Sequence, residues 1–380
     1  MRKILQILTF VFLLQAGATS CKKAYSPPAT NINYKYLVVN GTIINSPDSP
    51  TVITLSRTIQ LNDSTTVSSP EPGATVSIQG TSGEAYPLAE TAGGRYISTP
   101  LILNYTEQYQ LKITTSNASR YASDFVPVLQ TPPIDSVTWQ QENSVGVYVS
   151  TSDPSDKIKY YRWDYLETYQ YRSMFDRTIA EKNGLIYFVD STNQTYNCWR
   201  NENANSILIA STVALTNSVV VDAPLTTIPA NSVKLSVRYS ILVKQYAITA
   251  DAFQYLDVLK KNTENLGSIF DAQPTQLSGN VHCISNPQEI VIGYVMASSL
   301  QQQRTFINEY QLSGWNYVYD GPSCDEVVIT QNAGNFLLYN YADTSYAPYY
   351  FISPNLLDLA KNSCVDCRVM GGSTVKPAFW

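Results

Sequence analysis

Histidine is almost absent from this chain of 380 residues, which contains only His282. Catalytic triads and metal sites that depend on histidine would have to be built around this one position. The sequence also lacks the phosphate-binding GxxxxGK(S/T) loop, the GxSxG elbow, the HExxH zinc motif and the GxGxxG fingerprint. We therefore predict a protein that is not an enzyme and that uses no metal or cofactor.

Basic residues are also scarce, with 25 Lys and Arg against 30 Asp and Glu and a formal net charge of −5. A mildly acidic chain without a basic patch argues against nucleic acid as a partner, because such binding needs clustered Lys and Arg. Long apolar runs are missing beyond the first 20 residues, so we expect the body of the protein to be soluble.

The N-terminus has the layout of a signal peptide over residues 1–20, with Arg2 and Lys3 before the apolar stretch Ile4–Leu14. That stretch is too short to cross a bilayer, which needs roughly 20 apolar residues. The small residues of Ala18-Thr19-Ser20 directly precede Cys21 and resemble a bacterial lipobox. We predict lipid attachment at Cys21, with acyl chains such as palmitate holding the protein at a membrane, and simple secretion as the alternative.

The remaining chain is about 360 residues long, which favours two domains. Residues 21–33 form a polar tether, and residues 34–130 are predicted to form an immunoglobulin-like β-sandwich, because short β-type runs alternate with turn residues. Pro127 and the pair Pro132-Pro133 mark the boundary, since proline lacks the amide donor of a central strand. Residues 134–380 form a second β-rich domain, so the predicted fold class is mainly β.

One amphipathic helix is predicted from Ala250 to Leu266, with apolar residues at intervals of about three and four. Thr249 can cap its start and Gly267 can end it. Leu356–Lys361 is a candidate short helix. The expected strands are Tyr36–Val39, Thr51–Leu55, Ala74–Gln79, Arg95–Ser98, Tyr109–Thr114, Ser136–Gln140, Val145–Ser150, Tyr160–Tyr165, Glu289–Ala297, Arg304–Ile307 and Phe336–Tyr341.

Five cysteines follow Cys21, and an odd number leaves at least one unpaired if disulfides form after export. The disulfide candidates are Cys324, Cys364 and Cys367, although the spacing does not give their connectivity. Cys364 and Cys367 have the spacing of a redox motif, but no βαβ pattern surrounds them. We favour a structural bridge over redox chemistry, and zinc binding ranks lower because no second close pair exists.

Paired carboxylates keep one enzymatic alternative open, because glycoside hydrolysis needs only two acids in a cleft. The nearest pairs in sequence are Asp153 with Asp156, and Asp325 with Glu326, which we interpret as turn and surface charges. His282 is next to Cys283 but would point to the opposite face of a strand, so we interpret it as structural.

Tyrosine is abundant, with 28 Tyr against 11 Phe. An amphipathic ring suits strands whose outer face is wet, and it also suits exposed platforms that stack on a carbohydrate or peptide ligand. We favour the first interpretation for any single tyrosine and identify no ligand-binding residue.

Two segments carry a family resemblance. The first consists of residues 267–274, Gly-Ser-Ile-Phe-Asp-Ala-Gln-Pro, with Gly279-Asn280-Val281. The second is C-terminal and consists of Cys364-Val365-Asp366-Cys367-Arg368, Gly371-Gly372 and residues 376–380, Lys-Pro-Ala-Phe-Trp. Together they resemble domain-of-unknown-function family 4249 of Bacteroidetes-type bacteria. The resemblance implies an outer-membrane lipoprotein often encoded beside TonB-dependent receptors. The two motifs themselves also have structural explanations, as turn, backbone-approach and packing residues.

Three functional hypotheses follow. The first, implied by the resemblance and the anchor, is an accessory or ligand-binding component of a TonB-dependent uptake system, in contact with the receptor barrel. The second is an exported hydrolase that uses paired carboxylates, and the third is a structural or adhesive surface lipoprotein. The predicted location is the outer membrane, and Lys22-Lys23 after the anchor leave both the cell surface and the periplasmic face open.

Overall fold

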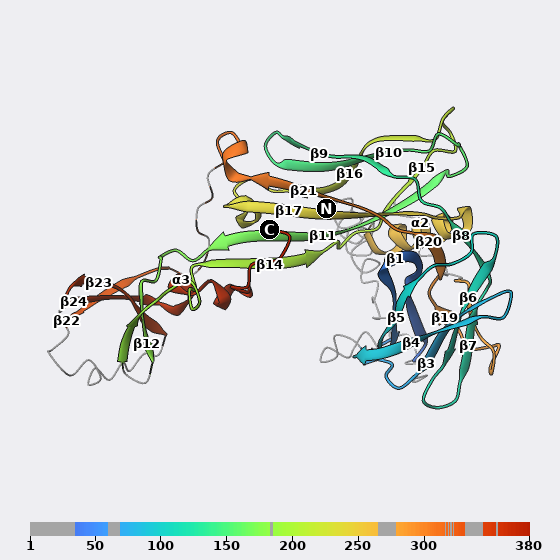
Figure 1. Ribbon diagram of the computed structural model, residues 1–380, viewed down its shortest axis with the longest axis horizontal. Helices are drawn as coiled ribbons and strands as arrows, with labels where there is room; N and C mark the ends of the chain where they lie inside the picture. Colours follow the sequence, from blue (N-terminus) through green and yellow to red (C-terminus); the bar gives the residue numbers. More distant parts are fainter. Residues whose placement is uncertain are drawn as a thin grey trace, which may run out of the picture.

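The structure is a computed structural model that describes residues 35–59, 69–182, 185–264 and 279–380, except 316, 318, 320, 322, 331–344 and 355. Three β-rich parts are visible in Figure 1: an N-terminal sandwich, a central pair of stacked sheets, and a small C-terminal sheet that extends away from them. The prediction of a mainly β fold with one prominent helix is confirmed. Within the described residues, no helix is long and apolar enough to span a bilayer.

The N-terminal sandwich is a sheet of 11 strands that closes on itself, because β8 pairs with both β20 and β6. A closed sheet leaves few free strand edges. Its strands are β1 (Leu37–Arg57), β2 (Ser69–Pro70), β3 (Thr75–Gly80), β4 (Ala85–Ala92), β5 (Arg95–Leu101), β6 (Gln108–Thr114), β7 (Arg120–Ser123), β8 (Val126–Leu129), β18 (Val281–Cys283), β19 (Val291–Ile292) and β20 (Met296–Ser299).

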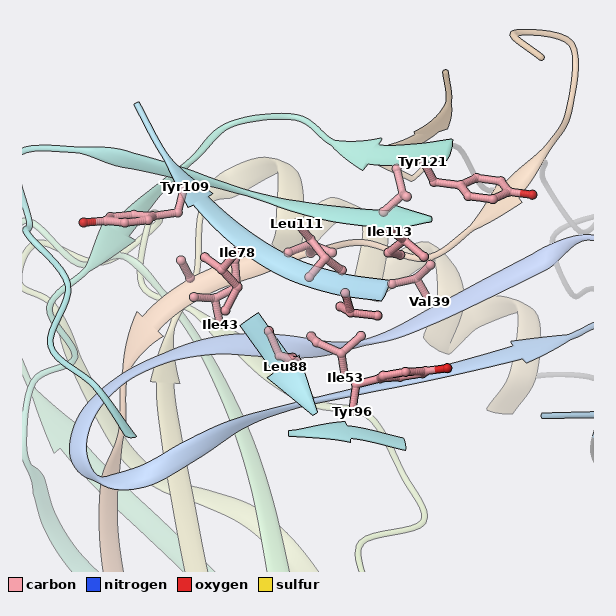
Figure 2. Close-up of a cluster of buried hydrophobic side chains, with 14 of the residues drawn as sticks. Val39, Ile43, Ile53, Ile78, Leu88, Tyr96, Tyr109, Leu111, Ile113 and Tyr121 are labelled. Atoms are coloured by element: carbon pink, nitrogen blue, oxygen red, sulfur yellow. The ribbon is translucent and has the colours of Figure 1, made fainter. Parts of the chain in front are cut away.

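The core of this sandwich follows from the period-two pattern of its strands. Along β6, Tyr109, Leu111 and Ile113 are buried while the residues between them are not. Figure 2 shows these side chains with Ile78 of the neighbouring strand β3 and with Ile53 of β1, all in one hydrophobic cluster. The apolar face of each strand therefore packs inward, as the sequence predicted.

The last three strands of the sandwich come from far along the chain. β1 pairs in parallel with β19 and β20, and β18 pairs with β7. Val281, Val291 and Ala297 complete the same hydrophobic core. The sequence boundary at residue 130 placed these strands in the second domain, because parallel pairing over such a distance leaves no local periodic pattern.

Pro127, which the sequence analysis placed at the boundary because proline cannot continue a central strand, lies inside the short strand β8. Val126 and Pro127 pair with β6, whereas Val128 and Leu129 pair with β20. The missing amide donor of Pro127 therefore falls where the strand changes partners, and the sheet tolerates it.

Gly279-Asn280-Val281 has a structural role at the edge of the sandwich. A Cβ on Gly279 would collide with the carbonyl oxygen of Gly293. The Asn280 side chain donates to the carbonyl oxygen of Val295 at 2.8 Å and accepts from its amide at 2.7 Å. A Cβ on Gly293, which has φ +145°, would collide with the carbonyl oxygen of Val39 in β1. Gly293 also lies between β19 and β20, so the strand predicted over Glu289–Ala297 is divided in two.

The central part stacks two sheets, with β9, β10 and β16 above β14, β11, β17 and β21 in Figure 1. The strands are β9 (Ile134–Gln141), β10 (Val145–Ser152), β11 (Tyr160–Arg172), β14 (Asn197–Asn203), β15 (Leu208–Ser211), β16 (Val219–Ile228), β17 (Arg238–Ala247) and β21 (Gln301–Asn308). Short 3-10 turns lie at η1 (Val233–Leu235) and η2 (Glu309–Gln311). Tyrosines supply much of this core, including Tyr161, Tyr165 and Tyr239.

The predicted helix is α2 (Ala250–Glu264), and Thr249 caps it by accepting from the amide of Ala252 at 3.2 Å. Ala252 and Leu256 are buried in a cluster with Ile44 and Met296 of the N-terminal sandwich. The helix therefore packs at the junction of the sandwich and the central sheets. The predicted last residues, Leu266 and Gly267, lie outside the described residues.

The C-terminal sheet consists of β22 (Glu326–Thr330), β24 (Leu356–Lys361) and β23 (Tyr346–Ser353), beside the hairpin β12 (Ile179–Lys182) and β13 (Leu185–Phe188). The short helix predicted over Leu356–Lys361 is wrong, because this segment is the middle strand. Its leucines favour a helix locally, but Leu357 and Leu359 are buried with Ile179 and Ile329, so tertiary packing decides. The chain ends with α3 (Asn362–Val365) and η4 (Cys367–Met370).

Candidate functional site

The predicted site residues form no common site. Cys21 lies outside the described residues. Cys364 and Cys367 do not bond to each other: the disulfides are Cys198–Cys367 and Cys324–Cys364. Cys198 had not been singled out, and no feature of its sequence neighbourhood identifies the partner. The first bridge attaches the C-terminal region to β14, whereas the second lies within the C-terminal region. Cys283 is the free thiol among the described residues.

The acidic pairs singled out in the sequence have structural roles. Asp153 accepts hydrogen bonds from the amides of Ser155, Lys157 and Ile158, which defines a turn. Asp325 accepts from Lys361 at 3.2 Å. Both aspartates are therefore engaged in contacts that shape a turn or join two segments, as the interpretation of turn and surface charges expects.

His282 and Cys283 point to opposite sides of β18, as the strand geometry predicted. Cys283 is buried, whereas His282 is exposed and lies 3.1 Å from a carboxylate oxygen of Asp124. No three His, Cys, Asp or Glu side chains converge as metal ligands within the described ranges.

A carboxylate pair that the sequence did not reveal lies across β11 and β14. Glu167 and Glu202 are directly opposite in the antiparallel register. Lys234 Nζ lies 2.6 Å from a Glu167 oxygen and 2.8 Å from a Glu202 oxygen. Tyr239 donates to Glu167 and Tyr169 to Glu202, each at 2.7 Å. We call these five side chains the carboxylate cluster.

The electrostatics of the carboxylate cluster favour the ionised form of Glu202. Burial raises the pKa of the Glu202 carboxyl, but hydrogen bonds from Lys234 and Tyr169 outweigh that effect and hold the pKa below its usual value. Burial opposes the charge of Lys234, and the two glutamates more than compensate, so its pKa is raised. A general acid needs the opposite arrangement, with a raised carboxyl pKa.

The carboxylate cluster borders a polar hollow of about 460 Å³, lined also by Asn205 and Thr226. Within the cluster, each glutamate is held by the shared lysine and by one tyrosine hydroxyl. Such a network fits a buried ion pair that orients β11, β14 and η1 better than a pair of catalytic acids.

A second hollow, of about 760 Å³, lies over one end of the central sheet. We call it the cationic aromatic pocket. Its floor is a row of side chains in register across three strands: Gln170 of β11, Arg238 of β17 and Asn308 of β21. Its other walls include Arg172, Glu309, Tyr310, Trp315, Lys376 and Trp380.

The C-terminal residues build one wall of the cationic aromatic pocket. Trp380 packs edge-on against Phe306 at 5.9 Å and donates its indole N–H to Gln170 at 3.2 Å. The Arg238 guanidinium lies 4.2 Å from the Phe306 ring centre and 5.2 Å from that of Trp380. The sequence interpretation of Trp380 as a packing residue describes this contact, but missed its place in a pocket wall.

The position of this wall depends on the Cys198–Cys367 disulfide and on two glycines. Gly371 ends η4 with φ +85°, a conformation that glycine adopts without strain. A Cβ on Gly372 would lie 2.3 Å from the Tyr171 hydroxyl. The chain therefore passes directly over β11 and β14, as the predicted close backbone approach requires.

The cationic aromatic pocket carries uncompensated positive charge. Arg172, Arg238 and Lys376 line it with a single acid, Glu309. Among the described residues, none of these three cations forms an ion pair. In a chain with a net charge of −5, this local excess of cationic side chains gives the hollow a potential that attracts anionic groups.

A third hollow, of about 910 Å³, lies at the N-terminal sandwich and differs from the cationic aromatic pocket in its charge balance. There Arg57 pairs with Glu71 at 2.6 Å and with Glu289 at 3.5 Å. Tyr121 donates to Glu289 at 2.6 Å. Because these charges satisfy one another, this hollow is a weaker candidate for ligand binding.

Fold and site together describe a mainly β protein with a polar hollow that is partly lined by aromatic side chains. The chain belongs to the family described as Domain of unknown function (DUF4249), whose model matches residues 22–304. This confirms the family resemblance found in the sequence. No curated protein matches the chain. The C-terminal wall of the cationic aromatic pocket lies beyond the matched range.

Proposed function

We propose that this protein is a lipid-anchored binding protein that serves a TonB-dependent uptake system at the outer membrane. The cationic aromatic pocket is the observation that carries the binding role, because it combines the exposed ring of Tyr310 and two half-buried indoles with cations that form no ion pair among the described residues, all over a paired sheet. The anchor rests on the lipobox before Cys21, and the uptake role rests on the family resemblance.

The anchor is tested by Cys21→Ser in the native host. We expect the wild-type chain to fractionate with outer membranes and to incorporate labelled palmitate, because several acyl chains hold a protein stably at a bilayer. The variant should lose the label and leave the membrane fraction. Membrane retention of an unlabelled variant would contradict the proposal, and Cys283→Ser is the matched control because this thiol forms no disulfide.

The partnership is tested by purifying the tagged chain from detergent at native expression. A TonB-dependent receptor should accompany it in roughly equal amount if the two act together. Absence of any such receptor, after mild crosslinking as well, would overturn the uptake role while leaving the anchor intact.

The hydrolase alternative has one observation in its favour, the facing pair of Glu167 and Glu202. The shared lysine and the lowered pKa of Glu202 oppose it. Turnover of any glycoside by the wild-type chain, lost in Glu202→Gln, would establish the alternative. The adhesive alternative expects a flat body without an aromatic-lined hollow, and the cationic aromatic pocket counts against it.

A further inference from the structure

We propose that the ligand of the cationic aromatic pocket is an acidic oligosaccharide, whose sugar rings carry carboxylates. This inference rests on the binding role proposed above and names its substrate class. Three observations support it: the excess of cationic side chains, the exposed ring of Tyr310 and the polar side chains of the floor.

The positive charge of the pocket favours a negatively charged ligand. Arg172 and Lys376 are exposed at the rim, whereas Arg238 is held between two rings in the floor. An aromatic face stabilises the cation without neutralising it, so the positive charge stays available to a ligand. Guanidinium and ammonium groups bind carboxylates through charge-assisted hydrogen bonds. A neutral ligand would leave these three cations without a counter-charge.

The aromatic rings favour a flat, partly apolar ligand. Tyr310 is 85% exposed, which is unusual for a large ring that borders a hollow. Trp315 and Trp380 add two indoles to the same walls. Rings of this kind offer apolar faces with polar edges, and the C–H faces of a pyranose pack on them while its hydroxyls reach polar groups.

The floor argues against an extended peptide. Gln170, Arg238 and Asn308 lie in register on one face of the sheet, where the backbones of β11, β17 and β21 already pair with one another. A peptide that adds as a strand would use the outer edge of β21, whereas a ligand that lies on the face of the sheet meets these three side chains. Amide and guanidinium groups instead match the hydroxyls and carboxylates of an acidic sugar.

The test is isothermal titration of the full chain in detergent with trigalacturonate and with its fully methyl-esterified form. We expect the acid to bind at least about tenfold more tightly than the ester, a difference of about 1.4 kcal/mol. Binding of the acid should weaken as salt rises from 50 to 500 mM, because the rim cations are solvent-exposed.

Two variants locate the site. Tyr310→Ala and Lys376→Gln should each weaken acid binding by about fivefold or more, since both side chains are exposed and their removal disturbs no core. Tyr105→Ala and Lys112→Gln are the matched controls, because these exposed residues lie on the N-terminal sandwich. The controls should bind like the wild type.

Several outcomes overturn the inference. Equal affinity for acid and ester would remove the role of charge, and unchanged binding in Tyr310→Ala would place the ligand elsewhere. Tighter binding of an acidic peptide of equal charge would assign the pocket to a different ligand class. If the receptor copurifies and no saccharide binds, the oligosaccharide inference is overturned and the uptake role stands. If saccharide binds and no receptor copurifies, the uptake role fails alone.

Discussion

At the scale of single residues, Glu202 connects the stability of the central sheets to pH. Its lowered pKa means that the folded state favours the ionised carboxylate. The resulting stabilisation is present above the unfolded pKa, about 4.3, and is lost as pH falls through the lower folded pKa. The carboxylate cluster should therefore weaken in acid.

Replacement of this carboxylate gives a direct test. Glu202→Gln should lower the free energy of unfolding at pH 7 by about 1–2 kcal/mol, because Lys234 and Arg200 lose the negative charge that they face and the hydrogen bond from Tyr169 loses its charged acceptor. At pH 3 the difference from the wild type should shrink. Urea unfolding at both pH values measures it, with the exposed Glu142→Gln as control. An equal loss at both pH values would refute the role of ionisation.

At the scale of elements, α2 shows local sequence and tertiary packing in agreement. The hydroxyl of Thr249 caps the first turn, and Asp251 lies where the helix dipole favours an anion. The buried residues Ala252 and Leu256 then hold the helix at the junction of two sandwiches. The cap at Thr249 and the buried contact between the two sandwiches therefore stabilise the same helix.

Removal of the cap should destabilise this junction. Thr249→Ala should reduce the free energy of unfolding by about 1 kcal/mol, since one amide of the first turn loses its acceptor. Thr249→Ser keeps the hydroxyl and should lose much less. Urea unfolding together with hydrogen exchange of the α2 amides provides the measurement. A serine variant as unstable as the alanine variant would exclude capping as the cause.

In β24, local sequence preference and tertiary packing disagree. Its sequence, Leu-Leu-Asp-Leu-Ala-Lys, contains good helix formers, yet it is the middle strand of a three-stranded sheet. Pairing on both edges and burial of Leu357 and Leu359 outweigh helix preferences of a few tenths of a kcal/mol per residue. No local pattern in the sequence distinguishes the two outcomes.

At the scale of the whole molecule, two disulfides fix the C-terminal region. Cys198–Cys367 joins β14 to η4 across 169 residues, whereas Cys324–Cys364 spans only 40. The first bridge precedes the segment that supplies Lys376 and Trp380 to the cationic aromatic pocket. It should therefore control both stability and the shape of the pocket.

The two bridges can be compared directly. The double variant Cys198→Ala with Cys367→Ala should lose about 2–4 kcal/mol in the free energy of unfolding and expose the C-terminal segment to protease. The matched pair Cys324→Ala with Cys364→Ala should leave that segment protected, because it closes a loop elsewhere. Urea unfolding and limited proteolysis measure these effects. Equal protection in both variants would contradict the assignment of the first bridge to the pocket wall.

The sequence by itself determined the features that short-range physics decides. Period-two alternation gave strands such as Tyr109–Thr114, a capped apolar stripe gave α2, and strand geometry separated His282 from Cys283. Local side-chain spacing and capping hydrogen bonds suffice for these. The family model matches residues 22–304, which contain the first of the two motifs that suggested the family.

Only the tertiary structure decided which distant segments meet. It returned residues 281–299 to the first sandwich, paired Cys198 with Cys367, and placed Glu202 opposite Glu167. It also gathered the cationic aromatic pocket from three strands, a turn and the C-terminal residues. These contacts depend on strand pairing and burial between segments far apart in the chain, and such long-range energies leave no pattern in a local stretch of sequence.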